Sequence, residues 1–344
     1  MTTRRGRPSR APSNLQMSDI AKLAGVSEST VSRALANSPL IAASTRARIQ
    51  RLAEEAGYAV NPIARSLRSR QTGVIAVAIP LVHDQAQQLS DPFMMTMLSL
   101  LADTLSARGY NMLLSKISTH EDGWVRRLQQ PGRSDGVILI GQSSEHGSIN
   151  EAARAGIPLV AWGTQLPAQK YPVVGTDNRR GGQIGTEHLI RHGRRRIAFL
   201  GDERLPEIDH RYEGYKQALR DAGLKPLPDL QVRSHFTSEE AYRSVRELIE
   251  RGADFDGVMA ASDVIAISAI RAITESGRRV PQDVSVVGFD DILIAEHAQP
   301  PLTTVRQDFV NGATALVDTV IAAIRGEQPA STTLAPTLIV RASA

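Results

Sequence analysis

The sequence predicts a small all-α helix-turn-helix domain followed by a larger α/β body made of two doubly wound parallel-sheet lobes. Residues 17–36 have the spacing of two short helices joined by a turn at Gly25. From Val74 onwards, short apolar runs alternate with amphipathic stretches, which is typical of parallel sheets with helices on both faces. Eight such runs over residues 73–344 favour two sheets rather than one.

Charge is distributed unevenly along the chain. The whole chain carries a formal charge of +4, but residues 1–70 hold 12 Lys or Arg against 4 Asp or Glu, and the remainder is net acidic. A basic end on an acidic body is the asymmetry expected when that end binds a polyanion. We therefore predict that residues 1–70 bind nucleic acid and that the charge of the body keeps it away from the nucleic acid.

The helix-turn-helix motif carries the expected contacts with DNA. Gly25 suits a left-handed turn, and we expect Ser18 and Ser27 to cap the two helices. The outward face of the second helix has short polar groups and one Arg, whose sizes suit phosphates and base edges in a major groove. An ordinary helical hairpin is the alternative. The expected DNA contacts in this motif are Ser18, Ser27, Glu28, Ser29, Thr30, Ser32 and Arg33.

Segments on both sides complete the basic region. A third helix is expected at residues 43–56, which closes a helical domain of residues 17–60. Residues 1–16 form a basic tail rich in Gly, Pro and Ser that cannot bury apolar area and should be disordered alone. Its run Arg5-Gly6-Arg7-Pro8 resembles an AT-hook core, although a solvated tail with nonspecific attraction to phosphates is the favoured interpretation.

The sequence predicts a hinge helix and linker at residues 61–72. Asn61 can cap a helix of about two turns, and Pro62 suits its first position. The segment carries Arg65 and Arg68 around the apolar Leu67. A helix this short is marginal in isolation, so we expect it to fold only against a partner or DNA.

The body of residues 73–344 is expected to alternate strands and helices. Ligands of such folds bind at the carboxyl ends of the strands, which here means between the two lobes. Predicted strands lie at 74–79, 112–115, 137–140, 159–162, 173–174, 197–200, 258–261 and 284–289. Predicted helices lie at 93–108, 148–155, 178–192, 210–222, 238–251, 263–276 and 309–325.

Several short motifs follow one another in order along the chain. They are Asp19-Ile20-Ala21, Ala24-Gly25-Val26-Ser27, Thr30-Val31-Ser32-Arg33, Asn61-Pro62, Asp177-Asn178, Arg211-Tyr212-Glu213-Gly214-Tyr215, Val286-Val287-Gly288-Phe289-Asp290-Asp291 and Pro301-Leu302-Thr303-Thr304-Val305-Arg306-Gln307. As an ordered set they resemble the LacI/GalR family of transcriptional repressors, from Met17 to the end of the chain.

The resemblance implies a body that is similar to type I periplasmic binding proteins. An N-lobe would take about residues 73–175 and 305–330, and a C-lobe about 176–304. The chain would cross between the lobes near 174–177, near 302–305 and close to the C-terminus. The resemblance also implies a homodimer that binds a palindromic double-stranded DNA operator.

For the hinge segment, the resemblance implies contacts at the centre of the operator. Leu67 matches an apolar residue that wedges between base steps in the minor groove, and Ala64 packs one turn before it. An apolar wedge unstacks a step at a cost of a few kcal/mol, which wider contact with the bent duplex recovers. Leu67 as a core residue of an ordinary linker is the alternative. With Asn61, Arg65 and Arg68, these residues complete the expected DNA contacts.

Scarce aromatic residues indicate a ligand site in the cleft. Phe93 begins the first helix of the body, Trp162 ends a strand, and Phe236 lies at a strand exit. Flat rings surrounded by charged donors and acceptors suit the apolar face of a sugar. The alternative for each ring is core filling. We expect the three to contact a small effector, with a sugar favoured over a purine or nucleoside.

The polar contacts of the effector are expected from the resemblance. Arg211 and Asp290 match residues that hold ligand hydroxyls, as a fork of donors and a carboxylate acceptor can do. Ser262 stands where many relatives have Asn, so it offers a shorter contact. Gly163 stands where many have an acid, and we expect that loss to leave room beside Trp162.

Other chemistry is not indicated. The chain has no cysteine, no apolar run near 18 residues and none of the common catalytic or phosphate-binding motifs, so we expect no cofactor, no enzyme activity and no membrane span. A cytoplasmic protein is the simplest account. Adjacent Asp290 and Asp291 should point to different sides, and we expect a surface role for His188 and His192. The alternatives are a solute-binding protein for transport and a sugar enzyme.

Overall fold

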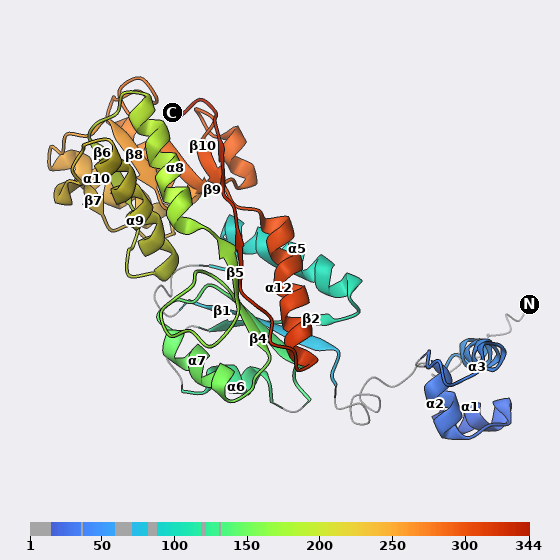
Figure 1. Ribbon diagram of the computed structural model, residues 1–344. Helices are drawn as coiled ribbons and strands as arrows, with labels where there is room; N and C mark the ends of the chain where they lie inside the picture. Colours follow the sequence, from blue (N-terminus) through green and yellow to red (C-terminus); the bar gives the residue numbers. More distant parts are fainter. Residues whose placement is uncertain (1–14, 36, 59–70, 82–87, 118–121, 131) are drawn as a thin grey trace, which may run out of the picture. The chain divides into compact units, whose positions relative to one another are not determined.

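The computed structural model describes residues 15–35, 37–58, 71–81, 88–117, 122–130 and 132–344. The chain divides into two compact units, Met1–Thr72 and Gly73–Ala344, and each has its own internal packing (Figure 1). The predictions for the AT-hook-like run 5–8 and for Asn61, Ala64, Arg65, Leu67 and Arg68 fall outside the described residues.

The first unit contains the predicted three helices around a small core. Buried Ile20, Val31 and Ile49, one from each helix, meet in that core. The helices are α1 (Met17–Ala24), α2 (Glu28–Leu35) and α3 (Ala43–Glu55).

The caps of the first two helices differ from the prediction at one position. Ser27 caps α2 as expected, because its Oγ accepts a hydrogen bond of 3.2 Å from the backbone N–H of Thr30. The prediction that Ser18 caps α1 is wrong. The N-cap is Gln16, two residues earlier, and the Asp19 carboxylate accepts a 2.9 Å hydrogen bond from the backbone N–H of Gln16. A carboxylate at the third helical position thus replaces the expected hydroxyl.

The N-lobe of the body is a six-stranded parallel sheet in the order β11-β5-β4-β3-β1-β2. The strands are β1 (Val74–Pro80), β2 (Asn111–Ile117), β3 (Gly136–Ile140), β4 (Leu159–Trp162), β5 (Val173–Thr176) and β11 (Thr332–Leu334). Strand β1 lies between β3 and β2, and it is apolar throughout because both faces on which its side chains alternate are buried. Ile75, Val77 and Ile79 pack on one face of the sheet, and Ala76 and Ala78 pack on the other.

Two pairs of helices cover these faces. Helices α5 and α12 cover the face that carries Ile75, Val77 and Ile79. Helices α6 and α7 cover the face that carries Ala76 and Ala78. The helices are α5 (Pro92–Ala107) and α12 (Phe309–Ile324), then α6 (Trp124–Leu128) and α7 (His146–Arg154).

The C-lobe is a second six-stranded sheet in the order β12-β10-β9-β8-β6-β7, with β12 antiparallel to β10 and the other pairs parallel. One continuous apolar core holds it together. Its strands are β6 (Ile197–Leu200), β7 (Gln231–Val232), β8 (Gly257–Ala260), β9 (Ser285–Asp290), β10 (Thr303–Arg306) and β12 (Thr337–Ile339). Its helices are α8 (Asn178–Arg191), α9 (Pro206–Asp221), α10 (Ser238–Glu250) and α11 (Asp263–Glu275), with short 3-10 helices η1 (Pro228–Leu230) and η2 (Leu293–His297).

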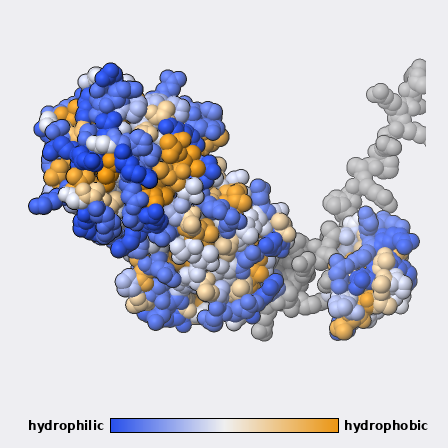
Figure 2. All heavy atoms as spheres, turned by 45° about the horizontal axis from the view of Figure 1, so that its top comes forward, coloured by the Kyte–Doolittle hydropathy of each residue, from blue (hydrophilic) through white to orange (hydrophobic). Residues whose placement is uncertain are grey.

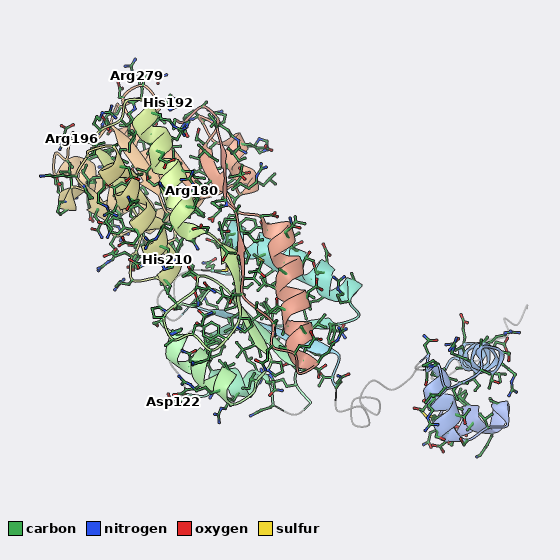
Figure 3. All side chains as sticks on the ribbon, viewed as in Figure 1. Asp122, Arg180, His192, Arg196, His210 and Arg279 are labelled. Carbon is green, nitrogen blue, oxygen red and sulfur yellow. The ribbon has the colours of Figure 1, made fainter. Side chains whose placement is uncertain are left out.

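The two histidines on α8 differ in burial. His192 is exposed and is labelled near the top of Figure 3, whereas His188 is only 4% exposed. Their ring centroids lie 4.2 Å apart, and burial lowers the pKa of His188. The expected surface role is therefore wrong for His188, because it lies on the side of the helix that packs against the sheet.

The chain passes between the lobes three times (Figure 1). The first crossing follows β5, the second joins β10 to α12, and the third joins β11 to β12. The last residues stay in the C-lobe, where the Ser343 hydroxyl accepts a 2.8 Å hydrogen bond from the Thr303 N–H and donates one of 2.6 Å to the Val286 carbonyl. Within the described residues, no helix combines the length and apolarity that crossing a bilayer requires.

Candidate functional site

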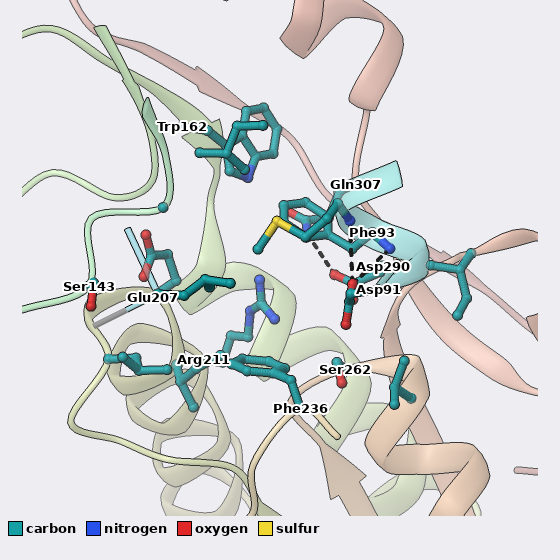
Figure 4. A pocket seen from close by; sticks show the side chains of 18 of the residues that line it. Asp91, Phe93, Ser143, Trp162, Glu207, Arg211, Phe236, Ser262, Asp290 and Gln307 are labelled. Carbon is teal, nitrogen blue, oxygen red and sulfur yellow. Dashed lines mark hydrogen bonds between the residues drawn. The ribbon is translucent and has the colours of Figure 1, made fainter. Parts of the chain in front are cut away.

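A cavity lies between the two lobes of the body, at the carboxyl ends of both sheets (Figure 4). About 750 Å³ of space lies within it, part of which is open to solvent at its mouth. Residues from both lobes line it. The six residues predicted from the sequence all lie on its wall: Phe93, Trp162, Arg211, Phe236, Ser262 and Asp290.

The aromatic residues of the N-lobe cluster around the start of α12. The ring centroid of Phe309 lies 5.5 Å from that of Phe93 and 6.1 Å from that of Trp162. Trp162 is only 4% exposed and belongs to the N-lobe core as well as to the cavity wall. Trp162 therefore both fills the core of the N-lobe and lines the cavity.

Gly163 does not leave the room that was expected beside Trp162. A Cβ at this position would lie 2.4 Å from Oε1 of Gln142, so the space is filled by that side chain. Gln142 is held there because its Oε1 accepts from the Thr164 N–H at 2.8 Å and its Nε2 donates to the Tyr171 hydroxyl at 2.9 Å. The expectation is wrong because a residue distant in sequence occupies the site.

Arg211 is fixed in position on α9. Its Nε donates to Oδ1 of Asn178 at 2.8 Å, its Nη1 donates to the Ala261 carbonyl, and its guanidinium carbon lies 3.7 Å from the centroid of the Phe289 ring. Burial lowers its pKa, and the negative charge of Asp290 opposes that shift. A guanidinium held in this way presents its fork in one orientation.

The helix that carries Arg211 is placed by close packing against α8. A Cβ at Gly214 would lie 1.9 Å from the Arg179 carbonyl oxygen, and one at Gly182 would lie 2.0 Å from the Arg211 carbonyl oxygen. Only glycine permits this approach of the two backbones. The close contact at Gly214 thus determines where α9 lies and how far Arg211 extends into the cavity.

Asp290 ends β9 inside the cavity and Asp291 turns away from it. Gln307 Nε2 donates to Asp290 Oδ1 at 2.7 Å, whereas the Asp291 carboxylate accepts from Arg306 Nε at 2.6 Å and from Arg341 Nη2 at 2.7 Å. The prediction that the two carboxylates point to different sides is confirmed. Burial raises the pKa of Asp290 to about 7, and Arg211 and Gln307 oppose the rise.

Ser262 has a structural contact in addition to its place on the cavity wall. Its Oγ accepts from the Ile265 N–H at 3.3 Å and caps α11. Beside the cavity, a side-chain hydrogen bond reaches from one lobe to the other: Thr164 Oγ1 of the N-lobe lies 2.7 Å from Nδ1 of His210 in α9. Figure 3 labels His210 on the C-lobe where it faces the N-lobe.

Sequence reasoning missed four polar residues of the wall, namely Asp91, Ser143, Glu207 and Gln307. Asp91 caps α5 by accepting from the Phe93 and Met94 N–H groups at 3.0 and 3.3 Å. Glu207 lies one turn before Arg211 on α9, so the i, i+4 spacing could have revealed it. Burial raises the pKa of Glu207, and N–H groups and Arg211 oppose the rise.

In the helical unit, the predicted DNA-contact residues lie away from its core. Val31 and Ala34 of α2 are buried, whereas the opposite side of the helix faces outward. Ser27 also hydrogen bonds to the hydroxyls of Ser29 and Thr30 at 2.8 and 2.9 Å. Ser27, Glu28, Ser29 and Arg33 are exposed, and Ser18, Thr30 and Ser32 are half-buried.

Comparisons with known proteins agree with this architecture. Residues 16–61 match the family model for bacterial regulatory proteins of the lacI family, and residues 186–344 match that for a periplasmic binding protein-like domain. The transcriptional regulator CelR of Thermobifida fusca is 36% identical over 84% of this chain and 85% of its own length. The ribose operon repressor of Haemophilus influenzae is 30% identical over 95% of this chain and 98% of its own length.

Solved structures show the same fold. A complex of the transcriptional regulator CelR with cellobiose superposes with a TM-score of 0.73 and 32% identity, over 96% of this chain and 100% of that one. A lac repressor dimer bound to operator and an anti-inducer superposes with a TM-score of 0.81 and 25% identity, over 96% and 98% of the two chains. These relatives are transcriptional regulators rather than enzymes, and the chain belongs to the LacI family of bacterial regulatory proteins.

Proposed function

We propose that this regulator is an operator-specific repressor of carbohydrate-utilisation genes whose affinity for DNA is controlled by a small sugar bound between the lobes. The observation that carries the proposal is the cavity itself. It combines aromatic side chains from both lobes with the fixed fork of Arg211 and the carboxylate of Asp290. The CelR–cellobiose complex supports a sugar as the ligand class.

The wall suits the two kinds of surface on a sugar ring. Phe93 and Phe236 offer apolar faces from opposite lobes, against which the C–H face of a pyranose can pack. Arg211 can donate to two neighbouring hydroxyl oxygens, and Asp290 can accept from two hydroxyls. A ligand that contacts both lobes in this way binds one interlobe arrangement better than another.

That difference in affinity is the basis of control. An effector changes operator affinity only if it binds the two arrangements unequally, and the coupling is reciprocal. For a sugar-sensing repressor we expect induction, so that the bound sugar releases the operator.

We propose that the protein acts as a homodimer on a palindromic operator in the cytoplasm. Large apolar residues are exposed on the body, among them Met95, Leu293 and Ile294, while hydrophilic residues surround the apolar clusters in Figure 2. Ile294 of η2 lines one groove with Pro92 at the start of α5. Exposed apolar patches commonly mark protein interfaces, and the lac repressor structure is described as a dimer.

The DNA contacts proposed for each protomer come from two segments. In α1 and α2 they are Ser18, Ser27, Glu28, Ser29, Thr30, Ser32 and Arg33. In the hinge segment they are Asn61, Ala64, Arg65, Leu67 and Arg68, whose roles are proposed from the sequence alone.

Two measurements on the purified full-length chain test the proposal. Thermal-shift screening of neutral sugars, including cellobiose and ribose, against nucleobases and nucleosides should give stabilisation by a sugar. Mobility-shift assays with genomic fragments should give selective DNA binding that the same sugar weakens. Attachment to DNA that is weak, salt-labile and indifferent to sequence would overturn the regulator, and stabilisation by nucleosides alone would overturn the sugar.

A further inference from the structure

The hydrogen bond between Thr164 and His210 joins the two lobes of the body outside the cavity. Thr164 follows β4 in the N-lobe, and His210 lies in α9 of the C-lobe, where that lobe faces the N-lobe in Figure 3. The two side-chain atoms lie 2.7 Å apart. A hydroxyl can donate or accept, so the bond forms with either tautomer of the ring. Within the described part of the chain, neither residue lines the cavity, so the bond requires no contact with an effector.

The N-lobe holds Thr164 in a fixed position. Its side chain is buried, and its backbone N–H donates to Gln142 Oε1 at 2.8 Å. Gln142 is fixed in turn, because its Nε2 donates to the Tyr171 hydroxyl at 2.9 Å and that hydroxyl also lies 2.9 Å from His146 Nδ1. The Thr164 hydroxyl therefore meets α9 from a rigid part of the N-lobe.

On the C-lobe side, the bond acts on the helix that carries Arg211. His210 directly precedes Arg211 in α9. The Arg211 guanidinium is bonded within the C-lobe, and the close backbone contact at Gly214 holds α9 against α8. Because α8, α9 and the guanidinium are held together, the contact with Thr164 also determines where Arg211 lies relative to the N-lobe wall of the cavity.

A body of two lobes joined by chain crossings can open and close about its cleft. An effector that contacts both walls binds only when the lobes face each other across one cavity. Its apparent affinity is therefore its intrinsic affinity multiplied by the fraction of molecules in that arrangement. A hydrogen bond between the lobes raises this fraction before the effector arrives.

We propose that Thr164 and His210 are positioning residues whose hydrogen bond holds the lobes in the effector-binding arrangement before any effector is bound. The bond keeps Arg211 of the C-lobe opposite Phe93 and Trp162 of the N-lobe, so that the site is formed in advance. This inference rests on the proposed function, because it specifies how the same cleft is prepared for its ligand.

The distance between the lobes in the effector-free protein tests the inference without a ligand. The chain has no cysteine, so Glu151→Cys on α7 and Asp221→Cys on α9 introduce one exposed labelling site in each lobe. Double electron–electron resonance then measures the distance between spin labels in the full-length chain, diluted into unlabelled chain so that each dimer holds one labelled protomer. Thr164→Val, which keeps the size but removes the hydroxyl, should broaden the distribution of distances, and His210→Phe should do the same. Distributions of equal width in the wild type and both variants would overturn the inference.

Effector affinity gives a second measurement on the same pair. In calorimetric titrations with cellobiose, Thr164→Val and His210→Phe should each bind about fivefold more weakly than the wild type, which is the effect of one hydrogen bond. The double variant should be no weaker than either single variant, because both changes break the same bond. Thr164→Ser keeps the hydroxyl and should restore the wild-type affinity. Losses that add in the double variant would show that the two residues act separately and would contradict the proposal.

Thr104→Val is the matched control, because the Thr104 hydroxyl donates to the Leu100 carbonyl at 2.7 Å within α5 and so stays within one lobe. It should leave both the distance distribution and the affinity unchanged. Failure of cellobiose and of every other sugar to bind would overturn the sugar effector. The distance distributions would still decide the role of Thr164 and His210, so the two failures are distinguishable.

Discussion

Arg341 donates a hydrogen bond of 2.7 Å from Nη2 to the carboxylate of Asp291 and so connects the segment that follows β12 to the turn that carries Asp290. Arg306, at the end of β10 and just before the second crossing, bonds to the same carboxylate at 2.6 Å. Asp290 and Asp291 have backbone φ values of 117° and 58°, which residues other than glycine rarely adopt. Such a backbone conformation costs on the order of 1–3 kcal/mol per residue and persists only where the surrounding structure holds it.

Replacing Asp291 with Asn should therefore loosen the turn. We expect Asp291→Asn to lower the free energy of unfolding of the body by roughly 2–4 kcal/mol, since it breaks two charge-assisted bonds to a carboxylate that is 7% exposed. Effector affinity should fall with it, because Asp290 is no longer held. Urea unfolding and sugar titration measure the two effects.

Asp283→Asn is the control for that change. Asp283 pairs with Arg279 on the surface of the C-lobe, far from the cavity, and surface pairs contribute little. If the two variants unfold at the same urea concentration and bind sugar equally, the turn is not held by the Asp291 pairs.

The ionisation of Asp290 should make effector affinity depend on pH. Burial raises its pKa to about 7, and the ionised carboxylate accepts hydrogen bonds from hydroxyls more strongly than the protonated carboxyl does. Sugar binding should therefore tighten as the pH rises from 6 to 8 and should release a proton. Titrations in buffers of different ionisation enthalpy would detect that proton, and the dependence should be absent in Asp290→Asn.

The raised pKa of Asp290 has the opposite consequence for the stability of the fold, which should fall as the pH rises. The pKa in the folded chain lies above its unfolded value of 3.8, so the contribution of Asp290 to stability is full below pH 3.8 and is lost as the pH rises through about 7. Asp290→Asn should thus gain stability relative to the wild type over that range, by at most about 4 kcal/mol. A constant difference in unfolding free energy across the range would contradict the raised pKa.

The glycine contact between α8 and α9 gives a fourth prediction. Gly214→Ala would place a methyl group 1.9 Å from a backbone oxygen, so the helices must separate. We expect a loss of about 1–3 kcal/mol in unfolding free energy and weaker sugar binding, because Arg211 moves with α9. Gly147→Ala on α7 is the control, since its Cβ would meet nothing within 4 Å. Equal melting temperatures for the two variants would argue against the close approach.

The sequence predicts most of the body because its central strands are buried on both faces. Strands β4 and β6 have the predicted bounds, and they are apolar without interruption. The prediction omitted β10 because Thr303 and Thr304 break the apolar pattern. Their buried hydroxyls are satisfied by the Arg341 N–H, which donates to Thr303, and by the Asp263 carboxylate, which accepts from Thr304; tertiary structure alone brings these partners near. Strands β7, β11 and β12 were missed because two or three residues carry no periodicity.

Residues of the site that lie in a sequence motif could be predicted, and residues that only the tertiary structure brings to the cavity could not. Arg211 and Asp290 lie in recognisable motifs and line one cavity. Glu207 lies outside any motif, and only its place one turn before Arg211 on α9 brings it to the cavity wall. Similarly, the absence of a side chain at Gly163 could not show that Gln142 fills the space, because the two residues meet only through the packing of neighbouring strands.

The last prediction concerns the hinge segment, where Leu67 is proposed as the apolar wedge. Leu67→Ala should lose most of the operator affinity, by roughly 2–3 kcal/mol, because the duplex can no longer be kept unstacked at the central step. The body should still bind sugar as before, since the change lies outside it. Mobility shifts and sugar titrations on the same preparation measure both.

Salt dependence separates a wedge from a charge contact. An apolar side chain displaces no counterions, so Leu67→Ala should leave the slope of log affinity against log salt unchanged. Arg65→Ala and Arg68→Ala should each reduce that slope by about one, because each removes a cation from the phosphates. If Leu67→Ala binds the operator as tightly as the wild type, the residue is an ordinary linker leucine, and the hinge segment holds DNA through its arginines alone.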